Sequence, residues 1–342
     1  MVTYVAAIVK RDFSNQCRNC TLVQSAARDQ TGHMPTDYRL EPCRSALNPV
    51  TGMPFKWSLN PYMGCAHRCT FCYVRAFELR ADRPSDDRYG RSIRVKTNVV
   101  DVLRAELAKP SWAHEVVAVG AATDPYQPAE GRFRLTRGCL EAFHDRWNPF
   151  SIITRGPLVV RDIDVLQAAS HRARVSVSLS IPTIDHDVWR VTEPGTAPPR
   201  QRLRAVRMLA DAGIRVGVSL APILPGLSDR PELLADAVRA ARDAGASKLW
   251  TEIVHLKPGT REHFLSTLAE VWPAEAAHIA AMYAKRAYPT RAESQDNATR
   301  VAALALAHPR QAVPPPIEPE PPRLAVQLGL AFDAVYEGGS AA

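Results

Sequence analysis

The segment Lys56-Trp-Ser-Leu-Asn-Pro-Tyr-Met-Gly-Cys-Ala-His-Arg-Cys-Thr-Phe-Cys-Tyr73 joins a short apolar strand to a loop that carries three cysteines. These cysteines, Cys65, Cys69 and Cys72, have the spacing C-x3-C-x2-C. A structural zinc ion and an iron–sulfur cluster each usually take four protein ligands. Three thiolates on one loop would leave one iron of a cubane cluster open to a substrate or cofactor. The alternative is three free or zinc-binding cysteines.

Strand-like and helical segments alternate on the C-terminal side of this loop. Apolar runs predict strands at residues 56–60, 115–119, 150–154, 174–179, 214–220 and 248–254. Amphipathic spacing predicts helices at residues 99–107, 135–143, 161–169, 199–212 and 231–244. Near-continuous apolar strands that alternate with helices indicate an α/β fold, with a parallel sheet covered by helices. Ligands of such sheets gather at the C-terminal ends of the strands, where the cysteine loop falls.

The composition fits a globular protein with one large α/β domain plus extensions, or with two ordinary domains. Of the 342 residues, 46% are hydrophobic, but no apolar run approaches the roughly 20 residues that span a bilayer. The run Val5-Ala-Ala-Ile-Val9 is too short for the core of a signal peptide. Seven cysteines, an odd number, in a chain too large to depend on disulfides predict reduced thiols and a cytoplasmic protein.

The flanks of the alternating region are less regular. Residues 1–50 show no sustained periodicity, so we expect an irregular extension there. Residues 51–265 form the expected core, and residues 266–312 an expected helical segment, with 274–285 and 292–307 as its better stretches. Residues 313–322 are rich in proline and glutamate, so residues 313–342 are expected to form an extended or disordered tail.

The charge of the chain is compatible with a polyanionic partner. The formal net charge is +8, and the sequence pI is about 9.3. Arg200, Arg204 and Arg207 are spaced to share one face of a helix. The alternative is that an arginine-rich surface simply follows from a composition dominated by alanine, arginine and proline.

Several segments at the predicted strand ends, together with the cysteine motif, carry a resemblance to a known family. They are Thr123-Asp-Pro-Tyr-Gln-Pro128, Ile153-Thr-Arg-Gly156, Ser178-Leu-Ser-Ile181, Glu193-Pro-Gly-Thr196, Ala221-Pro-Ile-Leu-Pro-Gly226 and Leu256-Lys-Pro-Gly259. Over residues 45–290 the chain resembles the radical S-adenosylmethionine (SAM) enzymes. Within them it is similar to the branch related to spore photoproduct lyase, a DNA repair enzyme, and to the uncharacterised bacterial members of that branch.

The resemblance implies a partial (βα)6 barrel and a [4Fe-4S] cluster on Cys65, Cys69 and Cys72. In that family SAM binds the open iron, and one electron from the cluster cleaves it to methionine and a 5′-deoxyadenosyl radical. This radical abstracts a hydrogen atom from the substrate. The resemblance thus implies a partner that supplies electrons, such as flavodoxin or ferredoxin.

The resemblance also gives roles to individual residues. Thr123 and Asp124 match the pair that holds the SAM amino group, and Arg155 stands where the branch usually has a lysine facing the SAM carboxylate. Ser178 is expected in the same region, and Phe71 is the aromatic residue before the last cysteine. The alternatives are a turn at Asp124, a surface charge at Arg155 and an ordinary strand serine at Ser178.

Two departures from spore photoproduct lyase limit the transfer of its chemistry. Ala121 and Ala122 occupy the place of its hydrogen-donor cysteine. Phe71 replaces one of the two tyrosines beside its last cluster cysteine, and Tyr73 is retained as the candidate catalytic residue. The hydrogen relay is therefore incomplete. We interpret Cys139 as a buried small hydrophobe rather than a replacement for the relay.

Other potential ligands lie near the N-terminus and inside the cysteine loop. Cys17, Cys20, His33 and Cys43 could form a zinc site or hold a second cluster, and the alternative is an irregular extension without a metal. His67 is expected to support the cysteine ligands or to face solvent.

Two classes of function follow from these observations. The first is a radical SAM enzyme, with nucleic acid as the leading substrate and a peptide or metabolite as the alternative. The second is a non-enzymatic iron–sulfur or zinc protein that docks nucleic acid through its basic surface.

Overall fold

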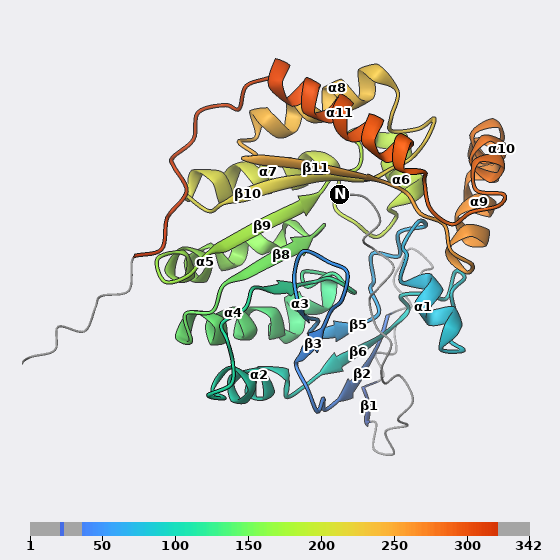
Figure 1. The fold of residues 1–342 in the computed structure, drawn as a ribbon. Helices are drawn as coiled ribbons and strands as arrows, with labels where there is room; N and C mark the ends of the chain where they lie inside the picture. The colour runs from blue at the N-terminus through green and yellow to red at the C-terminus, as the bar shows by residue number, and fades with distance from the viewer. Residues whose placement is uncertain (1–20, 24–35, 321–342) are drawn as a thin grey trace, which may run out of the picture.

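The computed structural model describes residues 21–23 and 36–320, and its central feature is a seven-stranded sheet. Its strand order is β11-β10-β9-β8-β7-β4-β3. The strands are β3 (Leu47–Pro49), β4 (Trp57–Leu59), β7 (Val117–Val119), β8 (Phe150–Thr154), β9 (Val175–Ser180), β10 (Val216–Ile223) and β11 (Lys248–Ile253). From β4 to β11 all neighbours are parallel, and β3 adds an antiparallel strand at one edge. The sheet is open, because β3 and β11 are its edges (Figure 1). The predicted parallel α/β fold and partial barrel are confirmed.

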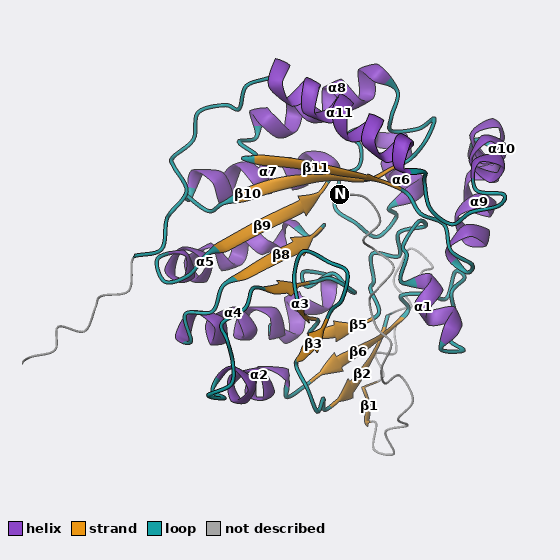
Figure 2. Ribbon diagram, viewed as in Figure 1, coloured by secondary structure: helices purple, strands orange, loops and turns teal. Residues whose placement is uncertain are grey.

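Helices cover the outer face of this sheet, as Figure 2 shows. They are α2 (Val99–Leu107), α4 (Leu135–Asp145), α5 (Ile163–Ser170), α7 (Pro199–Asp211) and α8 (Pro231–Asp243). Each agrees closely with its predicted range. The helix expected from residue 161 begins at Ile163, because a 3-10 helix (Pro157–Asp162) precedes it. Short helices α3 (Pro128–Phe133) and α6 (His186–Thr192) lie in loops after β7 and β9.

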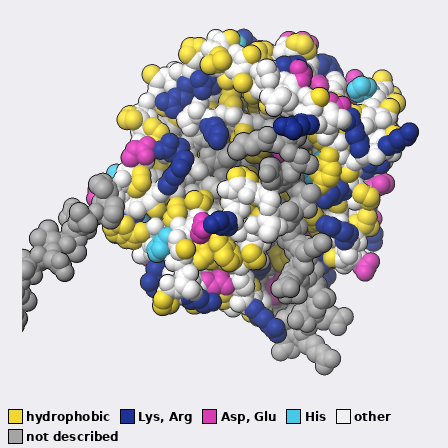
Figure 3. All heavy atoms as spheres, viewed as in Figure 1, with side chains coloured by type: hydrophobic (Ala, Val, Ile, Leu, Met, Phe, Trp, Pro, Cys, Tyr) yellow, Lys and Arg dark blue, Asp and Glu magenta, His cyan; other side chains and the backbone are white. Residues whose placement is uncertain are grey.

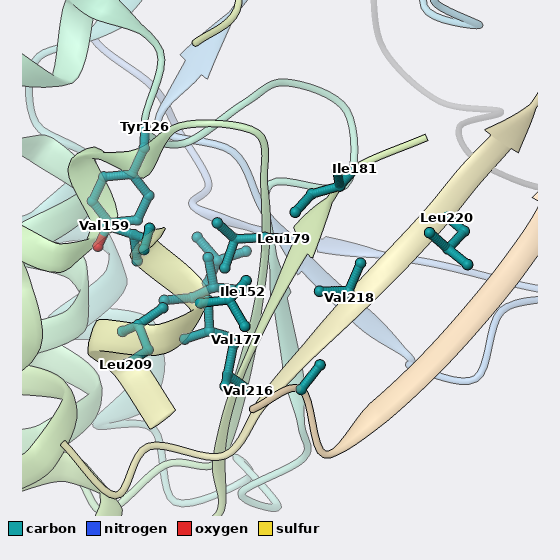
Figure 4. Packing of buried hydrophobic residues seen from close by; sticks show 14 of the residues in the cluster. Tyr126, Ile152, Val159, Val177, Leu179, Ile181, Leu209, Val216, Val218 and Leu220 are labelled. Carbon is teal, nitrogen blue, oxygen red and sulfur yellow. The ribbon is translucent and has the colours of Figure 1, made fainter. Parts of the chain in front are cut away.

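The core lies between the sheet and these helices (Figure 4). Val177 and Leu179 of β9 and Val216 and Val218 of β10 are at most 2% exposed, and Leu209 of α7 is fully buried. Burying a side chain of this size stabilises the fold by roughly 1.5–3 kcal/mol. The opposite face of these strands does not pack against the helices, and side chains on it can line a cavity.

The N-terminal part of the described chain corrects the expectation of an irregular extension up to residue 50. A second sheet has the order β1-β2-β6-β5, with β1 (Thr21–Val23), β2 (Asp37–Glu41), β5 (Tyr62–Met63) and β6 (Ser92–Lys96). β2 pairs with β6 in parallel, so that Asp37 faces Ser92. Within residues 37–49, β2 and β3 each find a partner elsewhere in the chain. Such pairing leaves no local periodicity to detect.

The C-terminal part begins with α9 (Thr260–Val271), which crosses the expected boundary at residue 265. It continues with α10 (Pro273–Met282) and α11 (Arg291–Ala307), close to the two predicted stretches. In Figure 1, α9, α10 and the short α1 (Arg75–Arg80) lie on the side toward which β8 and β9 point.

The described part of the proline-rich tail is extended, as expected, but it is attached to the core. The Ile317 N–H donates to the Gly213 carbonyl at 2.8 Å, and the Glu320 N–H donates to the His171 carbonyl at 3.0 Å. Residues 321–342 lie outside the described ranges. Within those ranges, no helix combines the length and apolarity that crossing a membrane requires.

Candidate functional site

The cysteine loop follows β4 and β5 at the C-terminal end of the parallel sheet. Cys65, Cys69 and Cys72 all line one cavity, which has a volume of about 230 Å³ and opens to solvent. Cys65 and Cys69 are buried, and Cys72 is partly exposed. The structure therefore brings the three predicted ligands together where ligands of parallel sheets usually bind.

Arg75 stabilises the cysteine loop through hydrogen bonds to backbone carbonyls. Its side chain is almost fully buried, and it donates to the carbonyls of Cys69 at 3.2 Å, Arg68 at 3.3 Å and Ser85 at 2.6 Å. Its guanidinium also lies over the Tyr89 ring, 4.5 Å from the centroid. Loop carbonyls that have no partner in a helix or sheet are satisfied in this way.

The last residue of α6 and the segment after it also bind the backbone of the cysteine loop. The Thr70 N–H donates to the Thr192 carbonyl at 2.9 Å, and the Gly195 N–H donates to the His67 carbonyl at 3.0 Å. A Cβ atom on Gly195 would lie 2.5 Å from the Ala66 carbonyl oxygen. Only glycine allows the two backbones to approach this closely.

The donor set fits a cluster held by three thiolates. Burial raises the pKa of the Cys65 thiol, and the neighbouring Asp124, Cys69 and Cys72 raise it further. Metal coordination reverses this effect, since a coordinating thiol is deprotonated. In the ranges that the structure describes, no group of three or more His, Cys, Asp or Glu side chains is placed so that it could hold a single metal ion. A cubane cluster does not need such a group, because each thiolate would bind a different iron.

A tyrosine hydroxyl contacts one of the three sulfurs. The Tyr89 hydroxyl oxygen lies 3.3 Å from Cys72 Sγ, and Tyr89 is 3% exposed. A thiolate at Cys72 would accept this hydrogen bond. Hydrogen bonds to the sulfur ligands are one of the means by which a protein sets the reduction potential of a cluster.

Asp124 lines the cavity, but its carboxylate already has several partners. Oδ1 accepts from Tyr126 N at 2.9 Å and Thr154 Oγ1 at 2.6 Å, and Oδ2 accepts from Arg155 N at 2.6 Å. His67 Nδ1 lies 3.3 Å from Oδ2. Burial raises the pKa of Asp124, but His67 and these hydrogen bonds outweigh burial and lower it. His67 is 5% exposed, so of its two expected positions the solvent-facing one is wrong.

Arg155 also lines the cavity and belongs to a buried ionic group. Arg155 Nη1 lies 2.7 Å from Glu193 Oε1, and Arg202 Nη2 lies 2.8 Å from Glu193 Oε2. The Glu193 side chain is fully buried. Burial raises the pKa of Glu193, but Arg202 and Arg155 outweigh burial and lower it. Arg155 Nη2 also donates to the Ala221 carbonyl at 3.3 Å. The bonds to Glu193 and Ala221 therefore use two of the five N–H donors of Arg155.

Tyr73 and Phe71 lie in the cavity wall. The Tyr73 hydroxyl donates to the carbonyl of Ala121, one of the two alanines at the place of the absent cysteine. Burial raises the pKa of Tyr73 well above its ordinary value, so this group keeps its proton at neutral pH. Phe71 is 5% exposed, and the Arg155 guanidinium lies 5.3 Å from its ring centroid.

The last two expected residues, Thr123 and Ser178, differ in whether they reach the cavity. Thr123 lines the cavity, but its hydroxyl already donates to the Gly64 carbonyl at 2.6 Å. Ser178 lies outside the cavity lining and accepts from Trp250 Nε1 at 3.2 Å, whereas Ser180, two residues further along β9, lines the cavity.

Sequence reasoning missed Trp250, Glu252 and His255, which also line the cavity. A signal for two of them was available. Trp250 and Glu252 alternate along the last predicted strand, and alternating side chains share one face of a strand.

The remaining candidates do not join this site. Arg200 and Arg204 are exposed on α7, Arg207 pairs with Asp211 at 2.8 Å, and all three lie outside the cavity lining. Figure 3 shows Lys and Arg side chains spread over several parts of the visible face. Cys139 is fully buried in α4, in line with our interpretation. Cys17, Cys20 and His33 lie outside the described residues, and the Cys43 N–H donates to Asn98 Oδ1 at 2.7 Å.

Together, the fold and the cavity define an α/β protein with a cysteine-lined site at the ends of its parallel strands. The chain belongs to the radical SAM superfamily, whose family model matches residues 59–238, and it is a radical SAM enzyme. An uncharacterised protein of Mycobacterium tuberculosis is 36% identical over 249 residues, which cover 72% of this chain and 73% of that protein. An uncharacterised protein of Methanocaldococcus jannaschii is 27% identical over 186 residues, covering 54% and 67%.

Solved structures show a similar fold. Spore photoproduct lyase complexed with dinucleoside spore photoproduct matches with a TM-score of 0.55 and 15% identity, over 79% of this chain and 78% of that chain. A mutant of that enzyme with bound SAM and the same dinucleoside matches equally well, with a TM-score of 0.55. At this identity the match concerns the fold alone.

Proposed function

We propose that Cys65, Cys69 and Cys72 hold a [4Fe-4S] cluster, that SAM binds beside it in the same cavity, and that the substrate is a nucleic acid. The convergence of the three thiols on a cavity that also contains Arg155 and Tyr73 carries the proposal. The bound cluster would supply the electron that cleaves SAM and so generates the radical that abstracts hydrogen.

In this proposal Arg155 binds the SAM carboxylate. Glu193 fixes the position of the guanidinium, and the N–H donors that Glu193 and Ala221 leave free can pair with an anion. Asp124 and Thr123 shape the neighbouring loop, because their side chains are already engaged there. We therefore assign the contact with the SAM amino group to the loop that Thr123 and Asp124 stabilise rather than to Asp124 alone.

Tyr73 is the proposed catalytic residue of the chain. Its protonated hydroxyl lies beside Ala121, where it can give a hydrogen atom to a substrate radical. The resulting tyrosyl radical would then take up one electron, from a donor such as flavodoxin or ferredoxin, and one proton from solvent.

Nucleic acid is the proposed substrate class for two reasons. The chain has a net charge of +8, and its fold resembles that of an enzyme solved with a dinucleoside lesion. The alanines at 121 and 122 and the phenylalanine at 71 indicate chemistry other than photoproduct reversal.

The test is anaerobic reconstitution with iron and sulfide, followed by measurement of 5′-deoxyadenosine released from SAM under reducing conditions. The proposal expects release by the wild-type protein and none by a Cys69→Ala variant. It also expects DNA or RNA binding that weakens steeply as salt rises. A reconstituted wild-type protein that leaves SAM intact would contradict the proposal, and binding absent at low salt would remove nucleic acid in favour of a peptide or metabolite.

A further inference from the structure

The wall of the cavity formed by β10 and β11 differs in character from the wall that carries the cysteines. Trp250 and Glu252 lie two residues apart on β11, so both point from the same face of the strand into the cavity. Trp250 is 38% exposed, so part of its side chain is accessible to a molecule in the cavity. Its ring is fixed by the hydrogen bond from Nε1 to Ser178 Oγ at 3.2 Å.

Two polar groups in this wall have properties that point to a ligand. Ser219 of β10 lines the cavity and is fully buried, and its hydroxyl has no hydrogen-bond partner among the described residues. Buried hydroxyls in native proteins normally have a partner. Glu252 lies in the same wall, and burial raises the pKa of its carboxyl group. Both side chains offer hydrogen bonds to a molecule inside the cavity.

The next turn of chain adds an uncharged ring and then a cation. The His255 ring lines the cavity and stacks on Tyr288, with centroids 5.2 Å apart. Burial lowers the pKa of His255 to about 4, so the ring is neutral at pH 7. Lys257 follows, and its Nζ lies 5.4 Å from the Tyr288 ring centroid. Positive charge is therefore available next to this wall, while the wall itself is aromatic and carries one carboxyl group.

We propose that Trp250, Glu252 and Ser219 form a subsite for a single nucleobase, which stacks on Trp250 and hydrogen-bonds through its edge to Glu252 and Ser219. A base has the flat face that an exposed tryptophan accepts, and its edge carries N–H donors and acceptors that a carboxyl and a hydroxyl can satisfy. A phosphate does not suit this wall, because Trp250, Glu252 and Ser219 offer it no cation. The sugar–phosphate backbone would instead stay near Lys257. This inference rests on the proposed function and names the part of the substrate that enters the cavity.

The test compares single-stranded DNA with and without bases. The probes are a fluorescein-labelled 12-mer of mixed sequence and the same 12-mer with abasic residues at its central positions. Their affinities are measured by fluorescence anisotropy at one fixed salt concentration. The wild-type protein is expected to bind the complete 12-mer at least about tenfold more tightly, in keeping with the contribution of base stacking.

The variants are Trp250→Leu and Glu252→Gln, each with a matched control. Trp147→Leu changes another exposed tryptophan, which lies after α4, and Glu232→Gln changes an exposed glutamate of α8. Neither control residue lines the cavity. Trp250→Leu should abolish the preference for the complete strand. Glu252→Gln should alter the ranking of the homopolymers dA12, dC12 and dT12. Both controls should behave as wild type.

Two results would overturn the subsite. One is equal binding of the complete and the abasic strand by the wild-type protein. The other is a base preference that survives in both Trp250→Leu and Glu252→Gln. Release of 5′-deoxyadenosine is measured on the same wild-type preparation. If the wild-type protein cleaves SAM but binds both DNA probes equally, the subsite alone is contradicted. If the wild-type protein does not cleave SAM, the proposed function is contradicted, whichever DNA probe binds more tightly.

Discussion

Gly195 is the position where a single methyl group should separate the cysteine loop from the segment that holds it. In Gly195→Ala the new Cβ would lie 2.5 Å from the Ala66 carbonyl oxygen and 2.7 Å from the His67 carbonyl oxygen. These contacts are with backbone atoms, so one of the two segments has to move. The hydrogen bond from the Gly195 N–H to the His67 carbonyl would lengthen or break as a result.

The magnitude follows from two contributions. Forcing an extra carbon into a packed site costs about 1–3 kcal/mol. Losing one hydrogen bond adds about 0.5–1.5 kcal/mol. We therefore expect the free energy of unfolding of the metal-free protein to fall by roughly 2–4 kcal/mol. We also expect less iron and sulfide per chain after reconstitution, because the movement displaces the loop that carries Cys65 and Cys69.

The assay combines urea unfolding of the metal-free protein with iron and sulfide analysis of the reconstituted protein. Gly131→Ala is the matched control, because a Cβ at Gly131 of α3 meets no atom within 4 Å. In a helix this control should be neutral or stabilising by about 0.5–1 kcal/mol. If Gly195→Ala has the stability and iron content of the wild type, the segment after α6 does not hold the loop and the reasoning is refuted.

Three further predictions concern single side chains of the cavity. Arg155→Ala should bind the cluster but lose about 1.5–3 kcal/mol of SAM binding energy, the range for hydrogen bonds to a charged group, as measured by equilibrium dialysis. Tyr89→Phe should make the cluster harder to reduce in an anaerobic redox titration followed by electron paramagnetic resonance, because a hydrogen bond to Cys72 Sγ stabilises the more negative, reduced state. Between pH 6.5 and about 4 the unfolded chain protonates at His255 while the folded chain does not, so acidification should lower the stability of the metal-free protein. This loss should reach about 3 kcal/mol and should be absent in His255→Gln.

Each of these predictions has a contradicting result. Unchanged SAM affinity in Arg155→Ala would mean that the headgroup binds elsewhere. An unchanged reduction potential in Tyr89→Phe would mean that the hydroxyl does not donate to the sulfur. Equal pH dependence in His255→Gln and the wild type would assign the acid sensitivity to other groups.

Local patterns were sufficient for much of the fold and for the meeting of the three cysteines at one cavity. The strand β8 agrees with its predicted range at both ends, because Phe150–Thr154 is an apolar run bounded by turns. The C-x3-C-x2-C spacing is equally local, and the three cysteines do meet at one cavity. The parts that were missed depend on partners far along the chain. β2 is recognisable as a strand only once β6 is beside it.

The same limit applies to the site. The ion pair between Arg155 and Glu193 joins residues 38 positions apart, and no motif in the sequence couples them. The partners of Asp124 come from three different segments, which is why the sequence alone left its carboxylate free for a ligand. Spacing predicts which residues a strand end presents, but not which of them the fold has already engaged.

Iron and sulfide analysis of anaerobically reconstituted cysteine variants tests the central claim most directly. The wild-type protein and the Cys43→Ala control should each bind about four irons per chain, because Cys43 lies outside the cavity lining. Cys65→Ala, Cys69→Ala and Cys72→Ala should each lose the [4Fe-4S] signal, since in the proposed site every thiolate would ligate a different iron. A Cys69→Ala protein that keeps four irons and still cleaves SAM would contradict the account.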